Sequence, residues 1–303
     1  MKKAIVTLAI GKKYIEMFDT LCVKGWSNYC AKFGYDLIVI KKQLDLSDRS
    51  RRRSPAWQKL LICSQEWSKN YDQIVWLDTD ILINLKYSGD ICNQTPIEKV
   101  SAVETYSIPN RHVHDIALKR LYLDWDKKRI KYIDNAQPHQ YYKNRGIKAI
   151  FEINEVVQTG VFVCSPAYHR EIFEHIYYSY EDRNGPEWNY EMPAMSYEII
   201  KNNLQNWIRP EYNFCVSNLT SAYYPFFFHE SGKYNIHKKL LRKAKSIILP
   251  GSSTLEKNQI LALRNIFEMG YFIHFAGCAS WMPVVHEQSI ISEGVGCVGH
   301  GVG

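Results

Sequence analysis

One stretch decides the fold of this chain: Ile74-Val75-Trp76-Leu77-Asp78-Thr79-Asp80. Its first four residues form an apolar run that is typical of a buried strand. Side chains two positions apart on a strand point the same way, so Asp78 and Asp80 can converge at the strand's carboxyl end, where open α/β sheets bind ligands. Two carboxylates that leave room for phosphate and water suit Mg²⁺ or Mn²⁺. The alternative interpretation is a pair of surface aspartates in a turn.

The residues before this stretch alternate between strand and helix patterns. Strands are predicted at Ala4–Ala9 and Asp36–Ile40. Between them, apolar residues recur every three or four positions from Ile15 to Phe33, which predicts a helix that ends at Gly34. A second helix is predicted after Pro55. Its apolar face consists of Trp57, Leu60, Leu61 and Ser64. This β-α-β-α-β order predicts an α/β fold with a mostly parallel, doubly wound sheet flanked by helices.

Later segments continue the pattern. Strands are predicted at Val156–Cys164 and Tyr271–Phe275, and helices from Pro166 and over Glu191–Asn202. Ser165 is expected to cap the helix that starts with Pro166.

The chain is expected to form one domain over residues 1–285. Residues 105–150 are rich in Tyr, His, Arg and Lys and less regular, and we interpret them as an insertion on the acceptor side of the cleft. Residues 286–303 are rich in glycine and are expected to form a flexible tail.

The composition and net charge of the chain indicate which classes of binding partner are favoured. The 303-residue chain is 46% hydrophobic, which suffices for one large core, and its net charge of +7 favours anionic partners. No nucleic-acid signature is present, so phosphate-bearing ligands are favoured, and a peripheral membrane contact stays open. The eight cysteines form no Cys-x-x-Cys pair, which fits buried thiols in a reducing compartment. With neither a signal peptide nor a membrane-spanning segment recognised, a cytoplasmic location is expected.

Three motifs occur in a fixed order: the strand ending in Asp78-Thr79-Asp80, then Gln158-Thr159-Gly160-Val161-Phe162-Val163, then His274-Phe275-Ala276-Gly277. Together they resemble the metal-dependent glycosyltransferases of the GT-A fold, especially the glycogenin-like and the galactosyl- or xylosyltransferase-like groups. The resemblance covers roughly residues 3 to 285. It implies a GT-A fold, a nucleotide-sugar donor and a divalent ion, commonly Mn²⁺ and otherwise Mg²⁺.

The resemblance also implies a ligand set for that ion. Asp78 would meet the metal and the donor ribose, and Asp80 and His274 would be metal ligands. A neutral imidazole beside two carboxylates tilts the preference toward Mn²⁺. For His274 the alternative is a core histidine bonded to a carbonyl group.

Further donor contacts follow from the same resemblance. Thr7 and Ala9 lie on the edge that binds the base, and Tyr14 lies where relatives stack a ring on uracil. Lys59 lies where relatives keep a basic residue near the donor. An ordinary surface tyrosine and a solvated lysine remain the alternatives for Tyr14 and Lys59. The donor-binding set is completed by Asp78, Thr79, Gly160 and Gly277.

The catalytic assignments rest on the resemblance as well. Gln158 matches the amide of the family's Asn-x-Gly strand, and Glu191 would be the acidic group that faces the sugar. The glutamine that follows the acidic residue in relatives is replaced by Met192. The lysine that clamps phosphate is missing after His274, so the metal or other Arg and Lys residues must balance the diphosphate. Trp281, in the segment that stands there instead, is predicted to stack on a sugar at the acceptor side.

The function implied is sugar transfer from a nucleotide diphosphate sugar, UDP-linked, to a hydroxyl group of a glycan, a lipid-linked or a protein acceptor. Retention of configuration is favoured, with Glu191 and Gln158 supporting an oxocarbenium-like state. Two other classes stay open. An aspartyl-phosphate phosphatase would carry its motif on the first strand, whereas here the motif follows two β-α units. A non-catalytic sugar-binding module would not need two carboxylates and a histidine around one ion.

Overall fold

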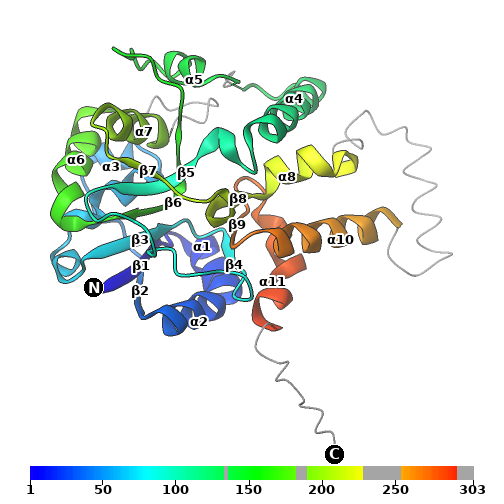
Figure 1. Cartoon of the computed structure of the whole chain (residues 1–303), viewed down its shortest axis with the longest axis horizontal. Helices are drawn as coiled ribbons and strands as arrows, with labels where there is room; N and C mark the ends of the chain where they lie inside the picture. Colours follow the sequence, from blue (N-terminus) through cyan, green and yellow to red (C-terminus); the bar gives the residue numbers. More distant parts are fainter. Residues whose placement is uncertain (133–135, 182–189, 228–253, 292–303) are drawn as a thin grey trace, which may run out of the picture.

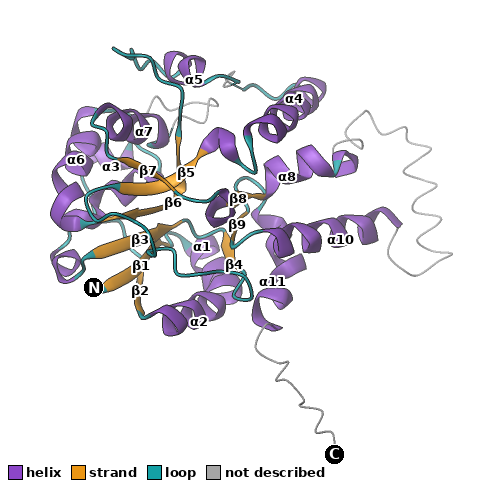
Figure 2. Cartoon of the chain, viewed as in Figure 1, coloured by secondary structure: helices purple, strands orange, loops and turns teal. Residues whose placement is uncertain are grey.

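The computed structural model describes residues 1–132, 136–181, 190–227 and 254–291. It is a mixed α/β structure in which helices surround a central sheet (Figure 2). Within these ranges, no helix combines the length and apolar character needed to span a bilayer.

The central sheet has six strands in the order β2-β1-β3-β6-β5-β7. The strands are β1 (Lys3–Leu8), β2 (Tyr35–Ile40), β3 (Gln73–Leu77), β5 (Val100–Glu104), β6 (Val157–Cys164) and β7 (Gln205–Trp207). The pairs β1–β2, β1–β3 and β5–β7 are parallel, and β6 runs antiparallel to both of its neighbours. The predicted mostly parallel α/β sheet is therefore confirmed, and one reversed strand interrupts it.

A second, three-stranded sheet lies just beyond the carboxyl end of β3. Its order is β4-β9-β8, with bounds Ile81–Ile83, Phe272–His274 and Phe214–Cys215. Because β4 follows the aspartates directly and pairs with β9 near the C-terminal end of the chain, residues almost 200 positions apart meet at one point. Figure 1 shows β4, β8 and β9 together beside the end of the central sheet.

Helical segments cover both faces of the central sheet. In chain order they are α1 (Lys12–Met17), the π-helix η1 (Phe18–Cys22), α2 (Val23–Phe33), α3 (Asp48–Arg51), the 3₁₀ helices η2 (Pro55–Ser64), η3 (Glu66–Asn70) and η4 (Thr105–Ser107), α4 (Arg111–Lys128), α5 (Pro138–Asn144), α6 (Pro166–Ser179), α7 (Met192–Lys201), η5 (Pro210–Asn213), α8 (Val216–Tyr223), η6 (Pro225–Phe227), α10 (Thr254–Met269), η8 (Ala279–Trp281) and α11 (Met282–Ile291).

Strand β1 shows how the sequence divides the core. Ile5 and Ala9 belong to a buried cluster with α2, α8, α10 and α11, whereas Ala4 and Val6 belong to a second cluster with η2, α6 and α7. Because successive side chains of a strand point to opposite faces, a strand with buried apolar side chains on both faces needs helices on both sides. The chain provides both layers.

Most predicted elements are present, with differences in detail. The helix from 15 to 33 is interrupted by the π-helix η1, and Gly34 ends α2 in a left-handed conformation (φ 72°). The segment after Pro55 is a 3₁₀ helix. Residues 105–150, interpreted above as a less regular insertion, contain the long helix α4 and the short helix α5.

The predicted boundary between the domain and its tail falls within a helix. Helix α11 runs across position 285 to Ile291, so the first residues of the segment 286–303 are helical. Residues 292–303 lie outside the described residues.

Candidate active site

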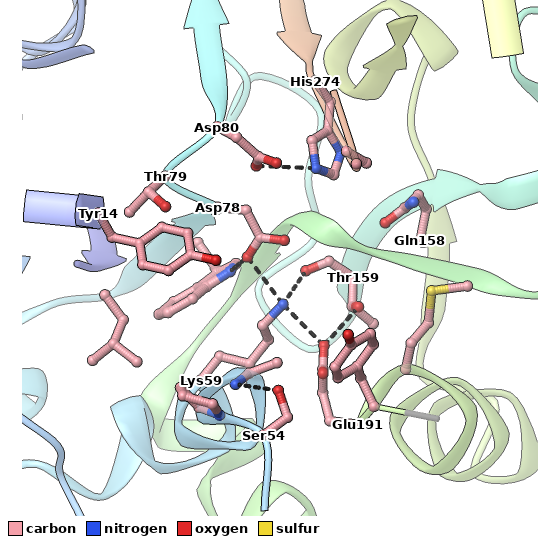
Figure 3. Close-up of a pocket in the computed structure, with 18 of the residues that line it drawn as sticks. Tyr14, Ser54, Lys59, Asp78, Thr79, Asp80, Gln158, Thr159, Glu191 and His274 are labelled. Atoms are coloured by element: carbon pink, nitrogen blue, oxygen red, sulfur yellow. Dashed lines mark hydrogen bonds and ion pairs between the residues drawn. The ribbon is translucent and has the colours of Figure 1, made fainter. Parts of the chain in front are cut away.

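Strand β3 delivers the two aspartates to the site. Past its last residue, the Asp78 amide donates to the carbonyl of Gly160 at 2.9 Å, which continues the pairing with β6. The Trp76 indole Nε1 donates to Asp78 Oδ1 at 2.8 Å and orients that carboxylate. The Asp80 carbonyl accepts from the amide of Phe275 at 2.9 Å, which ties the turn to the end of β9. Figure 3 shows both carboxylates facing the same pocket.

His274 reaches the aspartates because β9 pairs with β4, in the register Ile81 opposite His274. Its Nε2 lies 3.3 Å from Asp80 Oδ1, and its Nδ1 lies 2.8 Å from Asn213 Oδ1. Burial disfavours the charged imidazole, but the attraction and hydrogen bond of Asp80 outweigh it, so the pKa of His274 lies well above its usual value. Burial likewise opposes ionisation of Asp80, yet His274 holds the pKa of that carboxyl below its usual value.

These three side chains fit a divalent cation. One ligand atom from each of Asp78, Asp80 and His274 lies within 4.8 Å of the other two. Two carboxylate oxygens and one imidazole nitrogen form a donor set that Mn²⁺ accepts well. Gly160 makes room for the ring, because a Cβ added there would lie 2.3 Å from His274 Cε1.

Beside the two aspartates and His274, the site contains a buried lysine, Lys59. The side chain is buried in η2, and Nζ lies 3.0 Å from Asp78 Oδ1, 2.9 Å from Glu191 Oε1 and 3.1 Å from the carbonyl oxygen of Thr159 (Figure 3). Burial opposes the charged ammonium, but the two carboxylates outweigh it and raise the pKa of Lys59. An ammonium has three N–H donors, and all three have protein acceptors. Lys59 therefore links the metal-side carboxylate to Glu191.

Glu191 precedes α7 and is 2% exposed. Its Oε1 accepts from the Thr159 hydroxyl at 2.8 Å as well as from Lys59, while Oε2 has no hydrogen-bond partner among the described residues. The carboxylate is thus held firmly by one oxygen.

The segment Gln158-Thr159-Gly160 lies where β6 departs from regular pairing. Ala102 on β5 is opposite Phe162, but the next residue, Val103, is opposite Gln158. Such a bulge redirects side chains and is common beside active sites. Here Gln158 Oε1 accepts from the Gly160 amide at 2.8 Å, and Thr159 turns toward Glu191.

The site opens into a cavity of about 520 Å³, a size suited to a small-molecule ligand. The predicted residues that line it are Tyr14, Lys59, Asp78, Thr79, Asp80, Gln158, Glu191, His274 and Gly277. The described cavity lining also includes Trp76, Tyr141, Arg145, Thr159 and Tyr190.

Four predicted residues do not line this cavity. Thr7 and Ala9 are fully buried, and their neighbours Leu8 and Ile10 line the cavity instead, as strand alternation requires. Gly160 lies behind the His274 ring. Trp281 packs on Phe227, with ring centroids 4.9 Å apart, and belongs to the edge of the apolar core.

Sequence reasoning missed several contributing residues. Thr159 and Trp76 stood inside the quoted motifs, and their polar side chains next to the aspartate strand were an available signal. Asn213, which contacts His274, comes from η5 and carries no local signal. Its position follows only from the pairing of β8 with β9.

No protein-family model and no curated protein matches the sequence. Several solved structures resemble the chain. One is a glycosyltransferase involved in the glycosylation of the major capsid of PBCV-1, with 12% identity and a TM-score of 0.48, covering 94% of this chain and 100% of that one. Another is the galactosyltransferase LgtC in complex with donor and acceptor sugar analogs, with 11% identity and a TM-score of 0.45, covering 97% and 98%.

A third is the bifunctional glycosyltransferase WbbM, with 12% identity and a TM-score of 0.49. The match covers 95% of this chain and 49% of the WbbM chain, so this chain spans about half of that protein. All three of these solved structures are glycosyltransferases. The identity is too low to carry over a substrate or a ligand.

Proposed function

We propose that this protein is a metal-dependent glycosyltransferase that moves a sugar from a UDP-linked donor to an acceptor hydroxyl, with retention of configuration. The observation that carries the proposal is the convergence of Asp78, Asp80 and His274 at the wall of a cavity of about 520 Å³. A nucleoside diphosphate needs a divalent cation held by few protein ligands, so that phosphate oxygens complete its shell.

Asp78, Asp80 and His274 would hold that cation, and Mn²⁺ suits the set. When bound, the ion would neutralise the diphosphate that leaves the sugar. Asn213 supports this assignment, because Asn213 Oδ1 lies 2.8 Å from His274 Nδ1 and accepts from it, so that Nε2, 3.3 Å from Asp80 Oδ1, would bind the cation once it gives up its proton.

The remaining residues would act on the sugar. Glu191 lines the cavity, its Oε2 has no hydrogen-bond partner among the described residues, and its negative charge can stabilise an oxocarbenium-like sugar from one face. Lys59 would act as a positioning residue that fixes Glu191 and Asp78 relative to each other. Tyr14, 51% exposed at the cavity wall, is free to stack on the nucleobase.

The test is a panel of UDP-sugars incubated with the protein and Mn²⁺, with slow hydrolysis by water as the readout. At least one UDP-sugar should be hydrolysed, and a metal chelator should stop the reaction. Hydrolysis that continues under chelation would contradict the metal assignment, and inertness toward the whole panel would contradict the donor assignment.

A further inference from the structure

Arg145 is a buried cation that the site described above does not use. It follows α5, is 8% exposed and lines the cavity together with Tyr141 and Glu191. Its guanidinium stacks on the Tyr141 ring, 4.0 Å from the centroid, and Nη1 donates to the Tyr141 carbonyl at 3.2 Å. Tyr141 holds it in place without neutralising it.

The charge of Arg145 is unbalanced among the residues that the structure describes. Within those residues it forms no ion pair, and its buried Nε has no hydrogen-bond partner. Arg53, buried to a similar degree, gives the contrast, because it pairs with Glu181 at 3.1 Å and also bonds the carbonyls of Tyr177 and Tyr180. A guanidinium taken out of water without an anion is costly, so an anionic partner beyond the described residues is expected.

Arg145 stands where two cavities meet. A second cavity, of about 620 Å³, shares Arg145 and Tyr190 with the first. Its wall also carries Lys148, which is exposed, and Glu181, whose carboxylate is already paired with Arg49 at 2.6 Å and Arg53 at 3.1 Å. The described wall therefore has surplus positive charge.

We propose that the second cavity is the acceptor subsite and that Arg145 selects an acceptor sugar bearing a carboxylate, as in a uronic acid. The planar guanidinium offers two parallel N–H donors, which match a carboxylate better than a neutral hydroxyl. The position fits an acceptor, because the metal ligands and Glu191 lie on the first cavity and Arg145 lies at its junction with the second. This inference rests on the proposed sugar transfer and adds the class of acceptor.

The experiment compares matched neutral and acidic sugars. Methyl β-glucoside and methyl β-glucuronide differ only in a hydroxymethyl or a carboxylate group, and ligand-observed NMR measures their binding without turnover. The glucuronide should bind about tenfold or more tightly than the glucoside. Arg145→Gln should remove that preference, and Arg145→Lys should restore part of it. Arg170→Gln, at an exposed arginine paired with Glu174, is the control that should leave the preference intact.

Equal binding of the two sugars, or a preference that survives Arg145→Gln in a folded variant, would overturn the proposal. A second arm compares UDP-glucose with UDP-glucuronate. A preference for the acidic donor that depends on Arg145, without one for the acidic acceptor, would overturn the placement on the acceptor. The sugar-binding measurement contains neither UDP nor metal, so failure of the proposed transfer shows separately, as absence of Mn²⁺-dependent UDP-sugar hydrolysis.

Discussion

Lys59 shows how a single residue couples the two halves of the site. Its ammonium is 2% exposed and lies between Asp78 and Glu191, with both N–O distances at or below 3.0 Å. Removing one partner of a buried ionic group leaves an uncompensated charge, which costs far more than losing a surface ion pair. Lys59, which was predicted as a donor contact, therefore also stabilises the arrangement of Asp78 and Glu191.

Lys59→Met should lower the free energy of unfolding by about 3 kcal/mol, because Glu191 would lose its balancing cation. The control is Lys69→Met, which breaks an exposed pair with Glu66 and should cost far less than the loss of the buried pair. Chemical denaturation of both variants measures the difference. Similar losses for the two would show that the buried network contributes little.

Gly160 illustrates a steric requirement. A Cβ at this position would lie 2.3 Å from Cε1 and 2.8 Å from Nδ1 of His274, so the imidazole would have to move. Gly160→Ala should therefore weaken Mn²⁺-dependent UDP binding at least tenfold and cost about 1–3 kcal/mol of stability.

Gly25→Ala is the matched control, because a Cβ at that helical position meets nothing within 4 Å. It should leave UDP binding unchanged and stability equal or slightly higher. If Gly160→Ala kept the wild-type affinity measured by calorimetry, His274 would not be needed as placed.

Tyr14 lies at the first turn beyond β1 and is the candidate platform for the base. Stacking is worth about 1–3 kcal/mol per base, by analogy with single-stranded nucleic acids, so Tyr14→Ala should weaken UDP about tenfold. Fluorescence or calorimetric titration with UDP provides the measurement. An unchanged dissociation constant would show that Tyr14 is an ordinary surface residue that does not contact the base.

At the scale of elements, strands were more predictable than helix types. The mainly apolar runs at 4–9, 36–40, 74–77 and 156–164 correspond to strands β1, β2, β3 and β6, because a mainly apolar segment suits a sheet that is covered on both faces. The 3₁₀ geometry of η2 was not visible in the spacing of Trp57, Leu60 and Leu61, which fits an α-helix equally well. Nor was the π-helix η1, whose Cys22 Sγ approaches the carbonyl oxygens of Thr79 and Ile81 at 3.3 and 3.4 Å.

The packing of α4 on α8 gives a prediction about pH. His114 of α4 is buried beside Asn218 of α8, and burial chiefly lowers its pKa from 6.5 to about 4, while Asp115 raises it and Arg111 lowers it. Between these values the unfolded chain binds a proton that the folded chain does not. Stability should therefore fall as the pH drops from about 6.5 to about 4, by up to about 3 kcal/mol from this residue.

The measurement is the free energy of unfolding across that pH range for the wild type and for His114→Asn. Carboxylates titrate in both proteins, so the difference between the two curves isolates the histidine. The variant should lose less stability on acidification than the wild type. Parallel curves would mean that His114 does not stay neutral in the folded protein.

At the scale of the whole molecule, contacts between residues close in sequence could be predicted, whereas contacts between residues far apart in sequence could not. Asp78 and Asp80 are neighbours on one segment, so their convergence could be predicted from strand geometry. His274 was assigned through its motif, while Asn213 and Arg145 reach the site from η5 and from the end of α5 without any sequence pattern. Only the tertiary arrangement reveals that Lys59 forms ion pairs with two carboxylates, whereas Arg145 forms none with the residues that the structure describes.

The central claim is that one divalent ion, held by Asp78, Asp80 and His274, links the protein to a nucleoside diphosphate. Calorimetric titration of UDP with and without Mn²⁺, on the wild type and on Asp80→Asn, tests it most directly. The wild type should bind UDP at least tenfold more tightly with Mn²⁺, and Asp80→Asn should lose that gain while keeping its melting transition. Wild-type affinity for UDP with Mn²⁺ in Asp80→Asn, or no effect of Mn²⁺ on the wild type, would contradict the account.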